Sequence, residues 1–345
     1  MQKLESTVNY KQKLNNLEHL IDRNGVVCDS IVEHSLSFYG IEEQELQEFI
    51  KEQEKAGRSP DRTSVVQALK HYVRDWAREG EHEREAAFPC ILDILEGLYP
   101  GSNSGNMSAT ARVLLPGAGL GALGHEVASR EGVSTWSHSL DNLLTMKTAF
   151  EVVQNEWSTY MLLVYRYLEV NPSPDRIVLH PFIDGLSHHA TTGDLMRPVH
   201  VPEKQFDASR VLMVEGDFTQ VFTDAAAQYD VIITHFFIDT ARNLMSYLET
   251  IHQLLRAGGH WINFGPLLYG TGPFVQLSLD EIVLVSEALG FDFQETPETC
   301  GAQTFPGTTG GLSKVRGKYA AYGFDGRELK RNAYMAQVWL AQKTE

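Results

Sequence analysis

One stretch, Val113 to Gly121, constrains the fold of this chain more than any other. It reads Val-Leu-Leu-Pro-Gly-Ala-Gly-Leu-Gly, so a short apolar run enters a cluster of glycines, and a helix-like run through Ala128 follows. Open α/β sheets present their first strand to a nucleotide in this way, because glycines let the backbone approach a ligand closely. The stretch predicts a nucleotide-type cofactor site.

The glycine spacing leaves the identity of the cofactor open. Gly117, Gly119 and Ala122 satisfy a dinucleotide fingerprint. Gly119, Gly121 and Gly124 satisfy it equally well. NAD and S-adenosylmethionine both fit at this point, and so does a tight strand-to-helix turn without a ligand. Segments further along the chain have to separate these alternatives.

Charge and length limit the class of partner. The 345 residues carry a formal net charge of -16, which repels nucleic acid and anionic membranes and favours a small-molecule substrate. The N-terminus lacks a signal-peptide pattern, and no window approaches about eighteen consecutive apolar residues. The three cysteines, Cys28, Cys90 and Cys300, are too few and too scattered for a disulfide framework. We expect plain thiols and a cytoplasmic protein, with a nuclear location also open.

The order of expected elements predicts a doubly wound α/β sheet behind a helical N-terminal extension. Residues 1–108 are expected to form the helical extension or cap, and residues 109–345 the cofactor-binding domain, with a Ser/Asn/Gly-rich loop at 101–109 between them. Strands are expected at 111–116, 150–154, 211–214, 230–235, 260–264, 291–295 and 334–342. Helices are expected at 65–78, 81–98, 121–130, 157–169, 241–256 and 278–289. The two closing strands are expected to form a hairpin at the edge of the sheet.

Polar residues that follow the strands are the candidate functional groups, because ligands of such sheets bind at the carboxyl ends of the strands. Glu156 is placed to accept ribose hydroxyls, or else is a surface residue that starts a helix. Asp217 and Phe218 suit an adenine amino group and ring, or else Asp217 lies in a simple turn. Asp239 suits a substrate nitrogen, or else caps a helix. A loop ending at Tyr269 is expected to roof the crevice.

Four histidines, His180, His188, His189 and His200, lack a closed set of metal ligands, so we expect loop surface there and no metal site. No Gly-x-Ser-x-Gly elbow and no Walker-type Lys-Ser/Thr ending is present, which argues against hydrolase and kinase functions.

Taken together, several long segments resemble the carnosine N-methyltransferase family, also called N2227-like proteins. The shared segments are Val73-Arg-Asp-Trp76, Pro116–Gly121, Asn155–Ser158, Pro181–Ser187 with Arg197-Pro198, Gly216–Phe218, Phe236–Ala241 and Trp261–Asn263 with Gly265–Tyr269. They occur in the order of the family from about residue 66 onward. This set is far more specific than any glycine pattern.

The resemblance implies a class I methyltransferase fold, a Rossmann-like doubly wound sheet, that uses S-adenosylmethionine. The residues it implies for the cofactor are His71, Arg74, Gly117, Glu156, Asp217, Phe218 and His235, and Gly119 lies in the same turn. Asp239 matches the substrate-gripping aspartate of the family, and Tyr334 matches one of its substrate tyrosines.

Departures from the family concern the substrate. Where the family has a histidine after Pro-Leu-Leu-Tyr, this chain has Gly270, and a second tyrosine position is Asn332. Both changes argue against carnosine itself and leave a related amine or amide metabolite as the acceptor. Residues 133–148 form an insertion, which is either a genuine lid or a retained intron.

The expected function is therefore N-methyl transfer to a small nitrogen-containing acceptor. This acceptor is either an imidazole dipeptide similar to carnosine or a related amine or amide metabolite. Asp239 is expected to orient or deprotonate the acceptor N–H, while Tyr269, Gly270 and Tyr334 line the pocket. Two alternatives stay open: a methyltransferase-like binding protein that has lost catalysis, and an NAD(P)-dependent oxidoreductase. The number of copies in the assembly also stays open, with a homodimer among the candidates.

Overall fold

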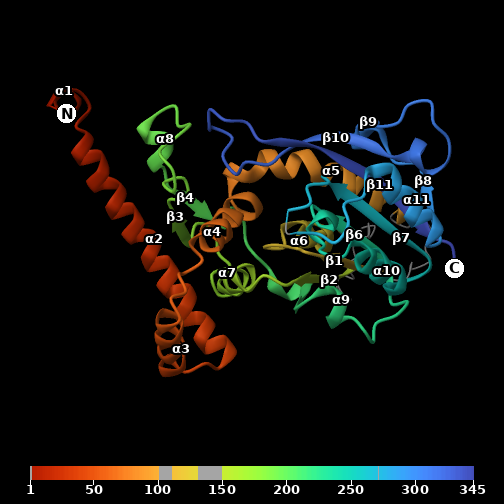
Figure 1. The fold of residues 1–345 in the computed structure, drawn as a ribbon, viewed down its shortest axis with the longest axis horizontal. Coiled ribbons are helices and arrows are strands. Elements are labelled where there is room, and N and C mark those ends of the chain that lie inside the picture. The colour runs from red at the N-terminus through yellow and green to blue at the C-terminus, as the bar shows by residue number, and fades with distance from the viewer. Residues whose placement is uncertain (1, 101–110, 131–149, 271) are drawn as a thin grey trace, which may run out of the picture. The chain divides into compact units, whose positions relative to one another are not determined.

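The computed structural model describes residues 2–100, 111–130, 150–270 and 272–345 (Figure 1). The chain forms two compact units. Unit 1 comprises Met1–His82, Thr159–Asp207 and Gly323–Arg331, and unit 2 comprises Glu83–Ser158, Ala208–Tyr322 and Asn332–Glu345. The predicted division at residue 108 stays a prediction. The predicted loop 101–109 and the insertion 133–148 lie outside the described residues.

The central feature of unit 2 is a nine-stranded sheet within the described residues, in the order β5-β2-β1-β6-β7-β11-β10-β9, with β8 paired to β11. Its strands are β1 (Ala111–Pro116), β2 (Phe150–Glu156), β5 (Val211–Glu215), β6 (Tyr229–His235), β7 (Leu255–Gly265), β8 (Phe291–Gln294), β9 (Ala302–Gln303), β10 (Arg316–Ala321) and β11 (Ala333–Lys343). The strands from β5 to β7 pair in parallel, as the sequence predicts. The fold is the predicted doubly wound α/β arrangement of class I methyltransferases.

The last strand corrects one prediction. β8 and β11 do pair antiparallel, with Ala341 opposite Phe293. However, β11 does not lie at the edge of the sheet, because it also pairs with β7 and with β10. An uninterrupted run from Ala336 to Ala341 is buried, as expected for a strand that is covered on both faces. No pattern in the sequence predicted β9 and β10, which extend the sheet beyond β11.

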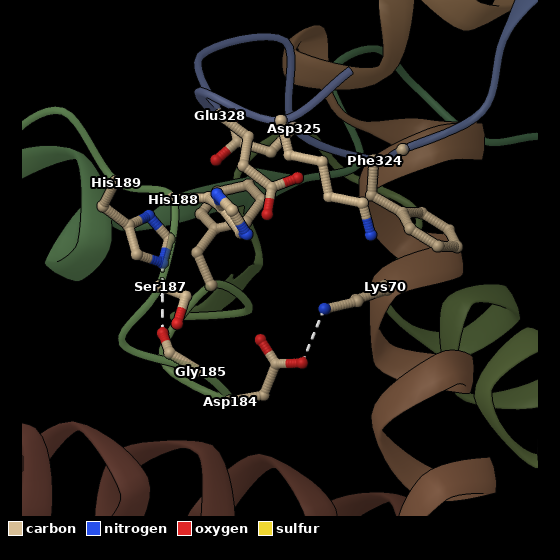
Figure 2. Close-up of a pocket in the computed structure, with 12 residues that line it drawn as sticks. Lys70, Asp184, Gly185, Ser187, His188, His189, Phe324, Asp325 and Glu328 are labelled. Atoms are coloured by element: carbon tan, nitrogen blue, oxygen red, sulfur yellow. Dashed lines mark hydrogen bonds and ion pairs between the residues drawn. The ribbon is translucent and has the colours of Figure 1, made fainter. Parts of the chain in front are cut away.

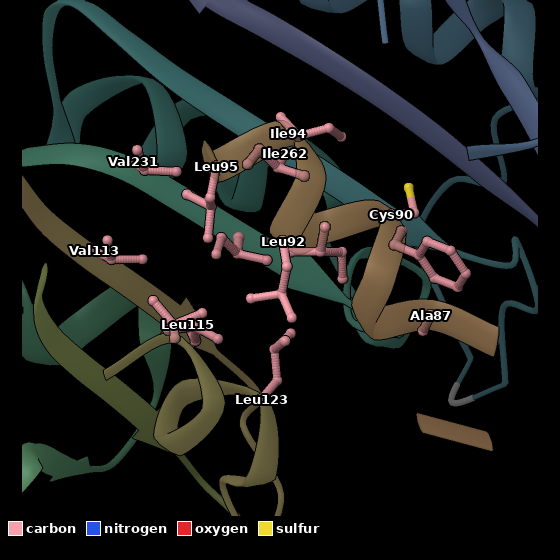
Figure 3. Packing of buried hydrophobic residues seen from close by; sticks show 14 of the residues in the cluster. Ala87, Cys90, Leu92, Ile94, Leu95, Val113, Leu115, Leu123, Val231 and Ile262 are labelled. Atoms are coloured by element: carbon pink, nitrogen blue, oxygen red, sulfur yellow. The ribbon is translucent and has the colours of Figure 1, made fainter. Parts of the chain in front are cut away.

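Helices cover the two faces of this sheet. They are α5 (Glu81–Leu98), α6 (Ala122–Ser129), α9 (Phe218–Val221), α10 (Leu244–Leu254) and α11 (Leu279–Ala288), with short 3-10 turns η2 (Ala208–Arg210), η3 (Ile238–Thr240), η4 (Glu298–Cys300) and η5 (Gly310–Lys314). Val113 and Leu115 of β1 pack with α5 and α6, whereas Leu114 packs with α10 and α11 on the opposite face. Figure 3 shows the first of these cores, with Leu92 and Leu95 of α5 above the strands.

A disulfide joins Cys90 of α5 to Cys300 of η4, across 210 residues of sequence. The prediction of plain thiols is therefore wrong for these two residues, while Cys28 is free. Both bonded cysteines are fully buried. Their spacing in the chain carries no sign of the contact, which arises only when α5 packs on the sheet. Cysteine usage therefore gives no support to the expected cytoplasmic location.

Unit 1 is mainly helical. Its elements are α1 (Gln2–Val8), α2 (Tyr10–Tyr39), α3 (Glu43–Lys55), α4 (Arg62–Trp76), η1 (Arg78–Gly80), α7 (Thr159–Val170), α8 (Thr192–Met196) and the antiparallel pair β3 (Ile177–Leu179) and β4 (Val199–Val201). Asp61 caps α4 by accepting the Ser64 N–H at 3.0 Å. The Tyr72 hydroxyl of α4 donates to the Val164 carbonyl of α7 at 2.6 Å. Within the described ranges, no helix is long and apolar enough to cross a membrane.

His180 corrects the expectation that the histidines lie on a loop surface. Its side chain is only 5% exposed. The Nδ1 atom of its ring lies 2.9 Å from the Met196 carbonyl, and its backbone exchanges two hydrogen bonds with the Asn24 side chain of α2. This histidine therefore anchors the segment after β3 to α2.

Candidate active site

The turn between β1 and α6 depends on glycine. Gly117, Gly119 and Gly121 have φ angles of 64°, 59° and 80°, which residues with a Cβ rarely adopt. A Cβ at Gly117 would overlap the Phe237 ring, and one at Gly121 would lie 2.5 Å from Oε1 of Gln154. The turn therefore requires glycine at these positions, because of its φ angles and because the Phe237 and Gln154 side chains leave no room for a Cβ.

Glu156, the last residue of β2, turns its carboxylate onto the glycine turn. Oε2 accepts the Gly119 N–H at 2.8 Å, and Oε1 accepts the N–H groups of Trp157 and Ser158 at 2.9 and 2.8 Å. Burial raises the pKa of this carboxyl, and these N–H donors partly offset the rise. Because Glu156 is only 9% exposed, the interpretation as a surface glutamate is excluded.

Asn155 joins the glycine turn to the turn after β5. Its carbonyl accepts the Ala118 N–H at 3.0 Å. Its buried side-chain amide donates to the carbonyls of Val214 and Gly216 at 3.0 and 2.8 Å. Asn155 belongs to a segment shared with the family, but its residue type and position in the sequence indicate no role. Its hydrogen bonds hold the two predicted cofactor turns at one end of the parallel strands.

Asp217 and Phe218 follow β5 and both have structural roles. Asp217 Oδ1 accepts the Thr219 N–H at 2.8 Å and so caps α9. Phe218 is 3% exposed, and its ring packs edge-on against Phe237 and Tyr247. Asp217 therefore has a local structural role, as the simple-turn interpretation expected: it is the N-cap of α9. Contacts of this pair with an adenine stay predictions.

Aromatic side chains gather where β6 ends. Phe236 has a left-handed φ of 52°, and its ring stacks on Tyr322 with centroids 4.9 Å apart. Tyr334 packs edge-on to both rings, with centroids 6.1 Å from Phe236 and 5.4 Å from Tyr322. The ring of the preceding residue, His235, packs edge-on against Phe236 with centroids 5.1 Å apart. No motif in the sequence indicated Tyr322, because β10, the strand that it follows, was not predicted.

Asp239 lies in η3, directly after β6, and is 7% exposed. Its Oδ2 accepts the Leu268 N–H at 2.8 Å, which holds the loop after β7 against this carboxylate. Burial raises the pKa of Asp239. Helix α10 begins five residues later, at Leu244, with Asn243 at its N-cap. The interpretation of Asp239 as the cap of this helix is therefore excluded.

The loop after β7 leaves space at Gly270. The Tyr269 hydroxyl donates to the Leu277 carbonyl at 2.8 Å, which fixes the end of this loop. Gly270 is exposed, and the nearest group to an added Cβ is the Leu268 carbonyl at 3.9 Å. The absence of a side chain at Gly270 is thus not forced by crowding within the described residues.

His71 and Arg74 belong to unit 1 and form a pair on α4. His71 Nδ1 donates to the Gln67 carbonyl at 2.8 Å, and Arg74 Nη1 lies 3.2 Å from His71 Nε2. Burial and the Arg74 charge lower the pKa of His71 to about 3, so its neutral Nε2 accepts from the guanidinium. The Arg74 guanidinium carbon lies 4.1 Å from the centre of the Phe324 ring.

Sequence comparisons match residues 51–345 to the family model for carnosine N-methyltransferase. The chain belongs to the carnosine N-methyltransferase family. The carnosine N-methyltransferase of Schizosaccharomyces pombe is 29% identical over 310 residues, covering 84% of this chain and 76% of that protein. The Mus musculus carnosine N-methyltransferase is 30% identical over 301 residues, covering 83% and 68%.

Membership of this family makes the chain an S-adenosylmethionine-dependent N-methyltransferase. The NAD(P) alternative and the loss of catalysis are not favoured. Among solved structures, the chain is similar to the CurJ carbon methyltransferase, with a TM-score of 0.42 and 15% identity over 80% of this chain and 58% of that one. The fold assignment rests on the strand order and the family model, since this structural likeness is too low to add to it.

The residues present fit the cofactor of this family. The glycine turn has backbone at left-handed φ angles without side chains, and Glu156 is a buried carboxylate fixed beside it. Across the described ranges, no group of three His, Cys, Asp or Glu side chains is arranged to hold a metal ion. The site therefore offers backbone, carboxylate and aromatic groups for a small organic ligand.

Proposed function

We propose that this chain methylates a nitrogen of a small acceptor that is held by Asp239 at the end of β6. The observation that carries the proposal is the burial of this carboxylate together with the aromatic group of Phe236, Tyr322 and Tyr334 that begins three residues before it. A carboxylate can hold an N–H, and aromatic faces suit a flat ring or the cation that forms on methylation.

Asp239 would position the acceptor and receive its proton. The bound S-adenosylmethionine supplies the methyl group as an electrophile. Transfer needs a nitrogen lone pair aligned with that carbon, so orientation by a fixed carboxylate contributes most. The N–C bond would form as the methyl–sulfur bond breaks and the neutral thioether leaves. Asp239 would take up the acceptor N–H proton, which its raised pKa favours.

Several residues of unit 2 would hold the cofactor. In unit 2, Gly117 and Gly119 would present backbone, Glu156 would accept hydroxyl groups and Asp217 would accept a purine amino group. Phe218 would contribute its backbone N–H and the small exposed part of its ring. His235 lies at the end of β6. The cofactor roles that the family resemblance implies for His71 and Arg74 of unit 1 stay predictions.

The acceptor would be an imidazole dipeptide or a related amine. No histidine after Tyr269 would hold it, because this position is Gly270. The relatives are named for carnosine, and the space at Gly270 widens the pocket on one side in this proposal. Asn332 at the second changed position is exposed. Both features support an acceptor that is bulkier than carnosine or is held less tightly.

The test is a methyl-transfer assay over carnosine, other imidazole dipeptides and simple amines, with Asp239→Asn beside the parent chain. We expect turnover to fall by at least about 10²-fold in the variant, as for the loss of a general base. Calorimetry with S-adenosylhomocysteine is the control and should give the same affinity in both proteins. Equal turnover in the variant would remove Asp239 from the mechanism.

The variant Gly270→His tests the acceptor class. If the open space at Gly270 sets specificity, this variant should raise the preference for carnosine over larger dipeptides. An unchanged order of acceptors would show that specificity arises elsewhere. Gly270→Ala, which leaves most of the space open and adds no imidazole, is the matched control.

We also propose that the chain does not bind nucleic acid, because its net charge is -16, and that it acts in the cytoplasm or nucleus. We further propose that the chain forms a homodimer. Light scattering of the purified chain tests the dimer, and a monomeric mass would reject it.

A further inference from the structure

The chain leaves β6 through an unusual backbone conformation at Phe236. This residue is one of the described residues other than glycine that have a left-handed φ, here 52°. His188 and Phe324, two of the others, lie in loops of unit 1 (Figure 2). Phe236 instead continues a buried strand, and its N–H still donates to the Phe264 carbonyl of β7 at 2.8 Å. Because residues with a Cβ rarely adopt this conformation, the neighbouring structure has to hold it.

Gly265, the last residue of β7, leaves room for this conformation. It is buried, and on its other side it lies opposite Gln337 of β11. A Cβ added to Gly265 would lie 3.1 Å from both the N and the Cα atoms of Phe236. Real Cβ contacts are rarely this close, and both atoms belong to backbone that is hydrogen-bonded to the same strand. An alanine at Gly265 would therefore displace Phe236 by a few tenths of an ångström.

Two successive rings leave the turn towards different cores. Phe236 packs against the core that contains α5 and α6, whereas Phe237 belongs to the core that contains α10 and α11. The Phe237 ring lies directly beside the glycine turn, since a Cβ added to Gly117 would lie 2.2 Å from its Cδ2 atom. The same ring stacks on Tyr247 with centroids 4.7 Å apart. The turn after β6 thus contacts the proposed cofactor turn through Phe237.

The same turn carries the groups proposed for the acceptor. The Phe236 ring stacks on Tyr322, and Asp239 follows three residues later. The Asp239 carboxylate accepts the N–H of Leu268, which lies three residues beyond Gly265. The ends of β6 and β7 therefore meet at two points, at Phe236 and at Asp239. A shift of Phe236 would move the proposed acceptor groups relative to the cofactor turn.

We propose that Gly265 is a positioning residue for methyl transfer. Because it lacks a Cβ, Phe236 can turn left-handed, and this turn sets the distance between the glycine turn and the Asp239 carboxylate. Transfer needs the acceptor nitrogen in line with the methyl carbon, and a misplacement of about 1 Å can lower a rate about 10²-fold. Gly265 acts through Phe236 and not by contact with either ligand. Because it acts in this same reaction, its role rests on the proposed function.

The first test is Gly265→Ala beside the parent chain. The acceptor is the one that the parent chain methylates fastest among carnosine, other imidazole dipeptides and simple amines. We expect kcat to fall by at least about tenfold, while the Kd of S-adenosylhomocysteine, measured by calorimetry, changes by less than about twofold. An unchanged kcat, or a loss of S-adenosylhomocysteine affinity as large as the loss of kcat, would overturn the proposal.

Ile262→Val is the matched control for stability. Ile262 is a fully buried residue of the same strand and belongs to the core beside α5. Removing one buried methyl group lowers the thermal stability but leaves the turn at Phe236 as it is, so kcat should stay within about twofold of the parent value. An equal loss of kcat in Ile262→Val and Gly265→Ala would show general destabilisation and overturn the proposal.

A second pair of variants tests the turn itself, also if Gly265→Ala does not fold. Phe236→Asn and Phe236→Val both remove the aromatic ring. Asparagine adopts the left-handed conformation far more readily than a β-branched residue does. We expect kcat of the Asn variant to exceed that of the Val variant by at least about tenfold. Equal kcat values in these two variants would overturn the proposal.

The parent chain distinguishes this role from the proposed function. A parent chain that methylates none of the acceptors rejects the proposed function, and the role of Gly265 with it. An active parent chain with an equally active Gly265→Ala variant rejects the role of Gly265 alone.

Discussion

The two units handle buried carboxylates in different ways. In unit 2, Glu156 and Asp239 accept hydrogen bonds from backbone N–H groups at the ends of parallel strands. In unit 1, Asp325 is paired with the guanidinium of Arg197, and the side chains of this pair are 5% and 10% exposed. The first arrangement leaves two carboxyls with raised pKa values, and the second neutralises its carboxylate with a full charge.

This difference has a physical cause. A parallel sheet aligns strand ends, so backbone donors converge on one edge and hold an acid that can still exchange a proton. Asp325 lies in the loop between β10 and β11, where it accepts a single backbone N–H, from Arg327, so this buried carboxylate needs a cation. The comparison predicts that unit 2 depends on backbone geometry, whereas unit 1 depends on side-chain charge.

The largest effect is expected from breaking the charge pair of unit 1. Arg197→Met leaves Asp325 as a buried charge without compensation, which should lower the free energy of unfolding by about 3–5 kcal/mol. Urea denaturation measures it. The double variant Arg197→Met with Asp325→Leu should recover much of the loss, because no charge is left buried. A double variant no more stable than the single one would contradict the assignment.

The disulfide between Cys90 and Cys300 is expected to stabilise unit 2. Replacing both Cys90 and Cys300 by Ser should lower the free energy of unfolding by about 2–4 kcal/mol, because the link closes a loop of 210 residues in the unfolded chain. Thermal unfolding with and without reductant measures the loss. Cys28→Ser, at the free cysteine, should match the parent chain. If reductant has no effect on the parent chain, the link does not contribute.

A smaller effect is expected at the glycine turn. Gly117→Ala adds a Cβ that overlaps Phe237 at a left-handed φ of 64°, so it should cost about 1–3 kcal/mol and weaken S-adenosylhomocysteine binding. Gly97→Ala in α5 is the matched control. Nothing lies within 4 Å of an added Cβ there, and the helix should gain about 0.5–1 kcal/mol. Similar losses in both variants would show that the turn has no special constraint.

The smallest effect concerns pH and His71. Its folded pKa of about 3 lies below the unfolded value of about 6.5, so the unfolded chain binds more protons between them and stability falls as the pH drops through this window. The expected loss on going from neutral pH to about pH 5.5 is of the order of 1 kcal/mol. Stability curves of His71→Gln should lose this part of the slope. An equal slope in the variant would mean that His71 takes up a proton in the folded chain.

The acid side of the rate profile offers a related check on unit 2. Because burial raises the pKa of Asp239, activity that needs its carboxylate should fall at a higher pH than for an ordinary aspartate. Methyl transfer measured across the acid range tests the sign. A fall only near the ordinary aspartate value would place the titrating group elsewhere.

Local patterns were enough to predict most of the elements. The apolar run and glycines of Val113–Gly121 predicted β1, the turn and α6, and the alternation behind them predicted the parallel strands. Long amphipathic stretches also predicted α4 and α5 closely. The very short strands β3, β4 and β9 lacked enough residues to form a period. The cofactor and the reaction class followed from the family segments, which carry more information than any single motif.

What the sequence by itself determined is therefore local: the glycine turn, the acids that follow β2 and β6, and the family. The tertiary structure alone decided the contacts between distant segments, such as the bond between Cys90 and Cys300 and the stacking of Phe236 on Tyr322. It also placed β11 inside the sheet and brought Asp325 to Arg197. The physical reason is that backbone conformation follows from neighbouring residues, whereas burial and pairing depend on which surfaces the folded chain brings together.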